Sequence, residues 1–249
     1  MGRIIAIANQ KGGVGKTTTA INLSACLAEA GKKVLTIDLD PQGNTTSGLG
    51  IDKDELENTV YELMLDECSI KESMKKTDIE NLTIIPANVN LAGAEIELLD
   101  VKEKEYVLKN SVDYIQDDFD FIIIDCPPSL NMLTINSMTT ANTILVPIQC
   151  EFFALDGLSQ LIYTVNLIRK QLNRLLTIEG IVFTMYDSRT NLSMQVVDNV
   201  KQNQNQHIYN TIIPRNVRLA ESPSYGMPII AYDPRSAGAE HYMMLADEV

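Results

Sequence analysis

The first thirty residues combine a short apolar segment, a glycine-rich run and a helical segment. The segment "RIIAIAN" is rich in isoleucine, which is typical of a strand buried in a parallel sheet. The run "QKGGVGKTT" follows it directly, and "TTTAINLSACLAEAG" then has the pattern of a helix that is closed by Gly31. A strand, a glycine loop and a helix in this order predict a phosphate-binding turn, because backbone N–H groups at the helix start point toward an anion.

Strand-like and helix-like segments alternate along the rest of the chain. Buried strands are predicted at "KVLTIDLD", "NLTIIPA", "FDFIIIDCPPS", "NTILVPIQ" and "TIEGIVFTM", and helices at residues 91–99, 103–115, 133–140 and 155–172. This alternation predicts an α/β fold of the P-loop NTPase type, a single domain over residues 1–249 with a mostly parallel sheet and helices on both faces. Residues 52–76 are expected to form surface helices and loops.

Composition limits the kinds of partner that the chain can attract. With 33 acidic and 20 basic residues the formal net charge is −13, which argues against general attraction to nucleic acid or anionic lipid. No apolar run approaches the roughly 18 residues of a membrane-spanning helix, and the start lacks the pattern of a signal peptide, so a cytoplasmic protein is expected. Four scattered cysteines and two histidines predict reduced thiols and no zinc site.

The glycine loop supplies the groups that a nucleotide triphosphate requires. Gly12, Gly13 and Gly15 allow the backbone to approach phosphate oxygens, and Lys16 would reach the β- and γ-phosphates. Thr17 would offer its hydroxyl to Mg²⁺, and Thr18 would contact the α-phosphate. The predicted phosphate-binding residues of the loop are Gly12, Gly13, Val14, Gly15, Lys16, Thr17 and Thr18.

Carboxylates follow two other predicted strands. Asp125 ends the apolar run "FIIID" and is a candidate Mg²⁺ ligand; the alternative is an ordinary aspartate that caps the next turn. Asp38 and Asp40 lie two residues apart in "TIDLDPQGN", hence on one side of a continuing strand. Such closeness is costly unless a cation or water separates the charges. Asp40 is the candidate to orient or deprotonate an attacking water.

With these elements the sequence resembles the ParA/Soj family of chromosome- and plasmid-partitioning ATPases. The resemblance rests on ordered blocks along the whole chain, which include "QKGGVGKTTTAINL", "DLDPQGNTTSGLGI", "IIIDCPPSL", "LTINSMTTANTILVPIQCEFFALDGLSQL", "IPRNVRLAESPSYGMPI" and "YDPRSAGAEHY". It implies ATP and Mg²⁺ as cofactors, weak ATP hydrolysis, and an ATP-dependent homodimer. The early phosphate loop matches the short type, which lacks an N-terminal helix-turn-helix.

The resemblance also implies roles for particular residues. Lys11 would be the signature lysine, a catalytic cation that crosses to the nucleotide of the second subunit; the alternative is that it adds positive potential at its own loop. Lys16 and Asp40 would be catalytic as well. Pro214 and Asn216 in "IPRNV" match positions beside the adenine.

The family further implies what the dimer contacts. Arg189 and Arg218 match positions that bind double-stranded DNA without sequence preference, and Lys201 and Arg215 could extend that surface. The expected partner is a ParB-type centromere-binding protein that stimulates hydrolysis, and the expected location is the nucleoid. Two alternatives remain: a nucleotide-dependent regulator of a replication initiator or cargo-positioning complex, and, less supported by the acidic end "AEHYMMLADEV", a MinD-like membrane-surface protein.

Overall fold

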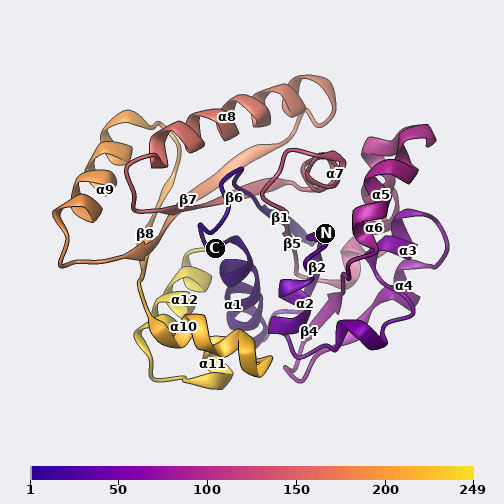
Figure 1. Cartoon of the computed structure of the whole chain (residues 1–249), viewed down its shortest axis with the longest axis horizontal. Helices are drawn as coiled ribbons and strands as arrows, with labels where there is room; N and C mark the ends of the chain where they lie inside the picture. Colours follow the sequence, from indigo (N-terminus) through magenta and orange to yellow (C-terminus); the bar gives the residue numbers. More distant parts are fainter. Residues whose placement is uncertain (1) are drawn as a thin grey trace.

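One eight-stranded sheet runs through the molecule, with helices on both of its faces (Figure 1). The computed structural model describes residues 2–249. The strand order is β3-β4-β2-β5-β1-β6-β7-β8, and every neighbouring pair is parallel except β3 with β4. The predicted fold class, an α/β P-loop type with a mostly parallel sheet, is therefore confirmed.

The elements follow one another in regular alternation. The strands are β1 (Arg3–Ile7), β2 (Val34–Asp38), β3 (Lys75–Lys76), β4 (Leu82–Ile85), β5 (Phe121–Asp125), β6 (Thr143–Gln149), β7 (Thr177–Tyr186) and β8 (Ile208–Pro214). The helices are α1 (Lys16–Glu29), α2 (Asn44–Gly48), α3 (Val60–Met64), α4 (Ile70–Ser73), α5 (Leu91–Glu97), α6 (Val107–Val112), α7 (Met132–Thr140), α8 (Ala154–Gln171), α9 (Asn191–Asn203), α10 (Val217–Glu221), α11 (Ile229–Tyr232) and α12 (Ala237–Glu248).

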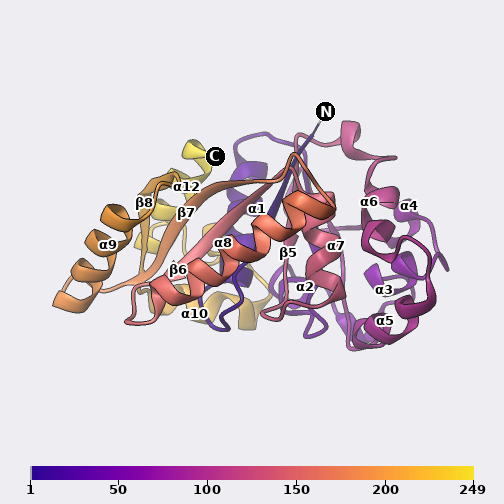
Figure 2. The same ribbon diagram turned by 90° about the horizontal axis from the view of Figure 1, so that it is seen from above.

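The alternation of side chains along β1 shows how the sheet builds two cores. Ile4 and Ala6 join the core formed with α7, α8 and α9, whereas Ile5 and Ile7 join the core formed with α1 and α12. Successive side chains of a strand point to opposite faces, so a strand that is apolar throughout is buried on both. Figure 2 shows α8 lying across β6 and β7 on the first of these faces.

The structure differs from the sequence expectation at several places. The sequence does not predict β8, the short helices α2, α10 and α11, or α12, and residues 52–76 are not only surface. In that segment Val60, Leu63 and Met64 of α3 are buried against the first core, and Lys75–Lys76 form an edge strand. The segment looks polar because the buried positions are separated by exposed acids and lysines.

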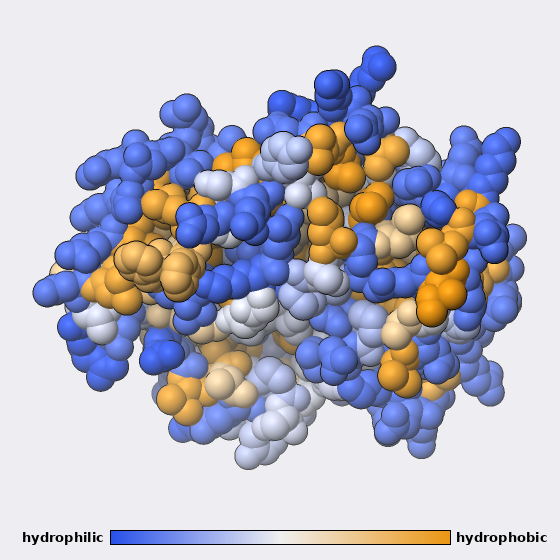
Figure 3. Space-filling model, turned by 45° about the horizontal axis from the view of Figure 1, so that its top comes forward, coloured by the Kyte–Doolittle hydropathy of each residue, from blue (hydrophilic) through white to orange (hydrophobic). Residues whose placement is uncertain are grey.

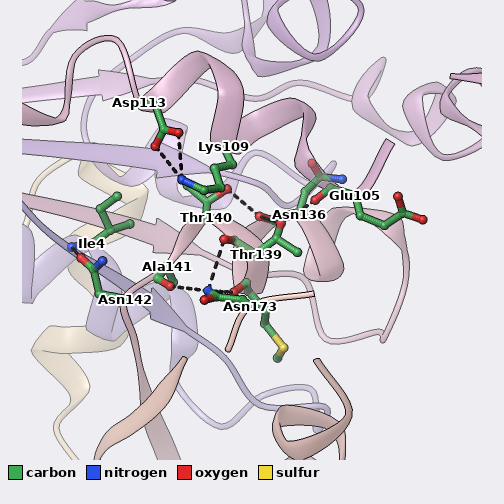
Figure 4. Close-up of polar contacts among 11 residues, drawn as sticks. Ile4, Glu105, Lys109, Asp113, Asn136, Thr139, Thr140, Ala141, Asn142 and Asn173 are labelled. Carbon is green, nitrogen blue, oxygen red and sulfur yellow. Dashed lines mark hydrogen bonds and ion pairs between the residues drawn. The ribbon is translucent and has the colours of Figure 1, made fainter. Parts of the chain in front are cut away.

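Polar side chains near the amino ends of the central strands act as structural ties. The Asn173 side-chain amide donates to the backbone carbonyls of Met138, Thr139 and Ala141 at 2.9–3.2 Å, and Oδ1 of the Asn142 side chain accepts the Ile4 N–H at 2.7 Å (Figure 4). The Asn173 bonds satisfy carbonyls at the end of α7 and join the α8–β7 turn to that helix.

The surface drawn in Figure 3 is mostly hydrophilic, with apolar side chains in separate patches.

The carboxylate of Glu248 ties α12 to β8. It accepts the backbone N–H of Asn210 at 2.8 Å, the backbone N–H of Thr211 at 2.7 Å and the Thr211 hydroxyl. Partial burial raises the pKa of Glu248, but these hydrogen bonds outweigh it, and the pKa lies below its ordinary value of 4.5.

We expect Glu248→Gln to lower the free energy of unfolding by about 1 kcal/mol at pH 7, since the carboxylate bonds are charge-assisted but solvent-exposed. A depressed pKa stabilises the fold above the unfolded-state pKa and ceases to do so as the pH falls through the folded-state value. The difference between the two proteins in urea unfolding should therefore shrink below pH 4.5. A difference that stays constant down to pH 3 would contradict this assignment.

Candidate functional site

The register of the sheet brings the loop after β1 and two carboxylates to one edge. Ile7 lies opposite Asp125, and Asp125 lies opposite Asp38, because β5 is paired with both β1 and β2. All three strands are parallel, so all three of these residues stand at carboxyl ends. Ligands of α/β sheets bind at this edge. A hollow there is lined by Gly12, Gly13, Gly15, Lys16, Thr17, Thr18, Asp40, Asn44, Pro128 and Met185.

Two glycines shape the loop that forms one wall of the hollow. Gly13 and Gly15 have φ angles of 74° and 86°, and Gly15 is the residue before the first turn of α1. Side chains other than glycine rarely adopt these angles, so the loop needs glycine at both positions. The Thr184 hydroxyl donates to the Val14 carbonyl at 2.8 Å, which fixes the loop to β7. The start of α1 is thereby held with its N–H groups toward the hollow.

Lys16 and Lys11, the two lysines of the loop, point to different places. Lys16 is 6% exposed and donates from Nζ to the Lys11 carbonyl at 2.8 Å. Burial lowers the pKa of Lys16, and the negative charge of Asp125 opposes that shift. The Lys11 side chain does not line the hollow and instead forms an ion pair with Glu151. Of the two lysines of the loop, Lys16 therefore lines the hollow and Lys11 lies outside it.

Asp125 meets the requirements of a metal ligand. Its Oδ2 accepts the hydroxyls of Thr17 at 2.8 Å and Thr45 at 2.7 Å, while its buried Oδ1 has no hydrogen-bond partner within residues 2–249. Burial raises the pKa of this carboxyl, and the charge of Asp38 adds to the effect. A buried oxygen without a partner is costly, and a cation at that position would remove the cost. Thr17 and Asp125 therefore fit Mg²⁺.

Two protein ligands, Thr17 and Asp125, agree with the coordination that Mg²⁺ prefers. Within residues 2–249 no three His, Cys, Asp or Glu side chains gather in a group that could hold a metal by themselves. Mg²⁺ usually keeps several waters and is bound by one or two protein oxygens plus phosphate oxygens of the substrate. The interpretation of Asp125 as a mere turn cap is disfavoured, because its hydrogen bonds go to side chains of two other segments.

Asp38 and Asp40 prove to be unlike each other. Asp38 is fully buried and accepts the backbone N–H of Thr46 at 2.8 Å, its hydroxyl at 2.7 Å and the Asp40 N–H at 3.2 Å. Burial raises its pKa, and the Thr46 bonds oppose that. Hydrogen-bond donors of the protein, rather than a cation, therefore stabilise the buried carboxylate of Asp38. Asp40 lines the hollow and accepts the Gln42 N–H at 3.0 Å. Of the two, only Asp40 can contact a ligand there.

An apolar pocket adjoins the hollow. Pro214, Asn216, Ile213, Leu219, Ala220 and Tyr242 line it, and it shares Gly15, Thr18 and Met185 with the hollow. The side-chain Oδ1 of Asn216 accepts the Arg218 backbone N–H at 2.8 Å and so caps α10. Met185, at a strained φ of 51°, stands where the two cavities meet. A nucleotide could therefore place a flat apolar base in the pocket and its phosphates in the hollow, with the part between them running beside Thr18.

Comparison with known proteins places this geometry in a family. The sequence profile of a family described as AAA domain matches residues 2–178. The sporulation initiation inhibitor protein Soj of Bacillus subtilis is 56% identical over 100% of this chain and 98% of its own. The chromosome-partitioning ATPase Soj of Treponema pallidum is 49% identical over 100% and 97%. The chain belongs to the ParA/Soj family.

The motif-based recognition of ParA/Soj is thus confirmed. Among solved structures, one described as cobyrinic acid a,c-diamide synthase from Mycobacterium smegmatis, with bound ADP and magnesium, superimposes with a TM-score of 0.88. It is 40% identical, and the match covers 99% of this chain and 93% of that one.

The ParA/Soj resemblance also assigned two arginines to DNA, and the structure gives each an acidic neighbour. Arg189 follows β7, is 84% exposed, and makes two hydrogen bonds to Asp187, at 2.8 and 2.7 Å. Its guanidinium holds the pKa of Asp187 well below the usual range. Arg218 pairs with Glu221 at 2.9 Å and Asp233 at 3.4 Å. Exposed ion pairs contribute little to stability, so phosphates could replace these carboxylates.

The two further cations proposed for DNA lie differently. Arg215 lies beside the carboxyl end of β7, since its backbone N–H donates to the Tyr186 carbonyl at 2.9 Å. It also lines the apolar pocket. Lys201 is in the last turn of α9, about 15 Å along the helix from its start beside Arg189. Arg215 therefore lies near the Asp187–Arg189 pair, since its charge also lowers the pKa of Asp187, whereas Lys201 is at the far end of α9.

Sequence reasoning missed several residues of the site. Thr45, Asn44, Pro128 and Met185 line the hollow or hydrogen-bond to Asp125, and Glu151 holds Lys11. Only Pro128 carried a local signal, since it follows the predicted strand that ends at Asp125. Asn44 and Thr45 lie four and five residues after Asp40 but carry no pattern of their own, and Met185 and Glu151 are brought in by segments far away in the sequence.

Proposed function

We propose that this protein is an ATP-dependent switch that closes into a dimer, binds DNA in that state and acts in chromosome or plasmid partitioning. As a ParA/Soj ATPase, it is an ATP hydrolase that uses ATP and Mg²⁺. The observation that carries the proposal is the separation of the two lysines. Lys16 faces the phosphate hollow of its own chain, while Lys11 lies outside that hollow at the surface.

The residues of the hollow have distinct roles in hydrolysis. The loop N–H groups and Lys16 would hold the β- and γ-phosphates, and Thr17 and Asp125 would hold Mg²⁺. Bound Mg²⁺ neutralises charge on these phosphates. Asp40 would accept a proton from, or orient, the attacking water, since it is the carboxylate of the hollow that is not engaged with Thr17. Pro214 and Asn216 would contact the adenine.

Lys11 of a second copy would complete each site. Charge that develops on the transferred phosphoryl group requires additional cationic stabilisation, which many NTPases obtain from an arginine supplied in trans. A lysine that arrives only on dimerisation has the same effect and makes hydrolysis depend on assembly. The interpretation of Lys11 as a source of potential at its own loop is disfavoured by its ion pair with Glu151.

Dimerisation would also create the DNA-binding surface. A chain with a net charge of −13 has no general affinity for DNA, so a local group must supply it. Arg189 and Arg218 occur once per chain, and the dimer doubles them. Because affinity rises with each phosphate that is neutralised, two weakly binding copies would bind together. A ParB-type protein would stimulate hydrolysis and release the dimer from the nucleoid.

We expect Arg189→Ala and Arg218→Ala each to weaken DNA binding by the ATP-bound dimer about tenfold or more at low salt, with no loss of ATP binding. Each change removes two phosphate contacts per dimer. The slope of log affinity against log salt should therefore fall in magnitude by roughly 2. Gel shift on several unrelated duplexes at three salt concentrations measures both effects.

Arg174→Ala is the matched control. Arg174 is exposed, but it precedes the amino end of β7, whereas Arg189 follows the carboxyl end of the same strand. It should leave both affinity and slope unchanged. If the two test variants bind like the wild type, the DNA surface lies elsewhere. A dimer that forms with ATP but never retains DNA would instead favour the regulator of a replication initiator or cargo complex.

Within residues 2–249 no helix combines the length and apolar character needed to cross a bilayer. The packing of the last helix bears on the membrane-surface alternative. The C-terminal helix α12 buries Ala239, Tyr242 and Leu245 in the second core, and the Tyr242 hydroxyl lies 3.1 Å from that of Thr19. An apolar face that is already packed in the fold is not available to lie on lipid.

A further inference from the structure

The Lys11 side chain is held away from the phosphate hollow by one carboxylate. Its Nζ forms an ion pair with Glu151, which follows the end of β6, and lies 5.7 Å from the centre of the Phe153 ring. The side chains of Lys11 and Glu151 are 33% and 34% exposed. The contact therefore joins the mouth of the glycine loop to the β6–α8 turn, and it is partly open to solvent.

The backbone of Lys11 is fixed by hydrogen bonds, whereas its side chain is held only by the contacts of its ammonium group. The Lys11 N–H donates to the Asn9 side chain at 3.0 Å, and the Asn9 amide donates to the Pro147 carbonyl at 2.8 Å. The Lys11 carbonyl accepts Lys16 Nζ at 2.8 Å. Only rotation about the side-chain bonds of Lys11 can redirect its ammonium group. The Glu151 ion pair and the Phe153 ring are the contacts that select the present direction.

The turn that supplies Glu151 carries an exposed aromatic pair. Phe152 and Phe153 are 77% and 60% exposed, and their rings pack edge to face at 5.1 Å. Large exposed rings next to a lysine whose proposed target lies on another molecule indicate a surface that a second copy covers. Burial of these rings would offset the loss of the ion pair when Lys11 moves.

We infer that Glu151 is a latch for Lys11: it keeps the lysine on its own chain in the monomer and yields it to the triphosphate of a second copy in the dimer. The inference rests on the proposed role of Lys11 in trans. A single carboxylate that is about one-third exposed binds an ammonium less strongly than a triphosphate, which presents several negative charges together. Lys11 therefore leaves Glu151 for the phosphates of the second copy once these are within reach. The strength of the Glu151 ion pair then determines how readily the dimer forms.

Glu151→Gln tests the latch, because it keeps the shape of the side chain and removes its charge. With Mg²⁺ and a non-hydrolysable ATP analogue, the protein concentration at half dimerisation should fall roughly two- to thirtyfold, the range expected from the loss of two exposed ion pairs per dimer. Basal ATP turnover at low protein concentration should rise by a similar factor. Analytical ultracentrifugation and phosphate release measure the two effects, and a melting curve verifies the fold.

Two further variants make the test specific. Asp156→Asn changes the charge by the same amount in the first turn of α8, at an exposed position away from the Lys11 ion pair, and should leave the midpoint unchanged. In a Lys11→Ala background, Glu151→Gln should have no effect on the midpoint, because the latch then has nothing to hold.

Each outcome decides a different question. If Glu151→Gln dimerises like the wild type or less readily, or lowers the midpoint equally in the Lys11→Ala background, the latch is wrong. If in addition Lys11→Ala has lost ATP turnover, the proposed function stands without the latch. If Lys11→Ala hydrolyses ATP at the wild-type rate, the proposed role of Lys11 in trans is itself wrong.

Discussion

Replacement of Asp40 by alanine is expected to lower ATP turnover by roughly two to four orders of magnitude, the usual contribution of a positioned general base. Nucleotide binding should persist, because the loop, Lys16 and Thr17 are untouched. A dimer that binds ATP but cannot hydrolyse it should then accumulate. Phosphate release measures the first effect, and size exclusion with Mg²⁺ and ATP measures the second. The trapped dimer should also retain DNA for longer than the wild type does.

The expectation depends on the different surroundings of two nearby carboxylates. Asp40 lines the hollow and is half-buried, whereas Asp38 is occupied by Thr46. Asp54→Ala, an exposed aspartate on the connection between α2 and α3, is the control and should hydrolyse ATP normally. If Asp40→Ala turns over ATP at the wild-type rate, its role as the base is wrong. Loss of nucleotide binding in that variant would mean that it acts on the fold of the hollow instead.

What the sequence could predict of the fold follows from local pattern. β1, β2 and β5 are continuous apolar runs bounded by polar residues, and their burial on both faces makes the run itself the signal. β8 has no such run, because "IYNTIIP" alternates buried and exposed positions near the edge of the sheet. α12 was missed for a related reason. Its acidic surface positions obscure the small and aromatic residues that it buries against α1 and β8.

The residues of the site also divide into those that a local sequence pattern can predict and those that it cannot. Gly13, Gly15, Lys16 and Thr17 could be named from sequence because the loop that holds them is contiguous. The bond from Thr45 to Asp125 spans 80 residues and that from Thr184 to Val14 spans 170, so no local pattern could reveal them. The difference between Asp38 and Asp40 is of this kind too. It depends on where α2 places Thr46, which the chemistry of an aspartate pair does not specify.

Lys16→Ala is the second change with a large expected effect. The Lys16 ammonium is the only lysine charge that lines the hollow among residues 2–249, and a hydrogen bond to a charged group contributes about 1.5–3 kcal/mol. Affinity for ATP should therefore fall by one to two orders of magnitude. The ATP-dependent dimer should be absent at ATP concentrations that saturate the wild type. Equilibrium binding of a fluorescent ATP analogue and size exclusion measure the two effects.

Lys53→Ala is the matched control for Lys16→Ala. Lys53 also donates from Nζ to a backbone carbonyl, that of Gln42 at 2.8 Å, but it does not line the hollow. It should bind ATP and dimerise like the wild type, which separates loss of a phosphate contact from loss of a lysine-to-carbonyl tie. A Lys16→Ala protein that dimerises at wild-type ATP concentrations would show that assembly does not require the triphosphate to be held in this hollow. The closing of two copies around their nucleotides, on which the roles of Lys11, Glu151 and the arginines all depend, would then have to be abandoned.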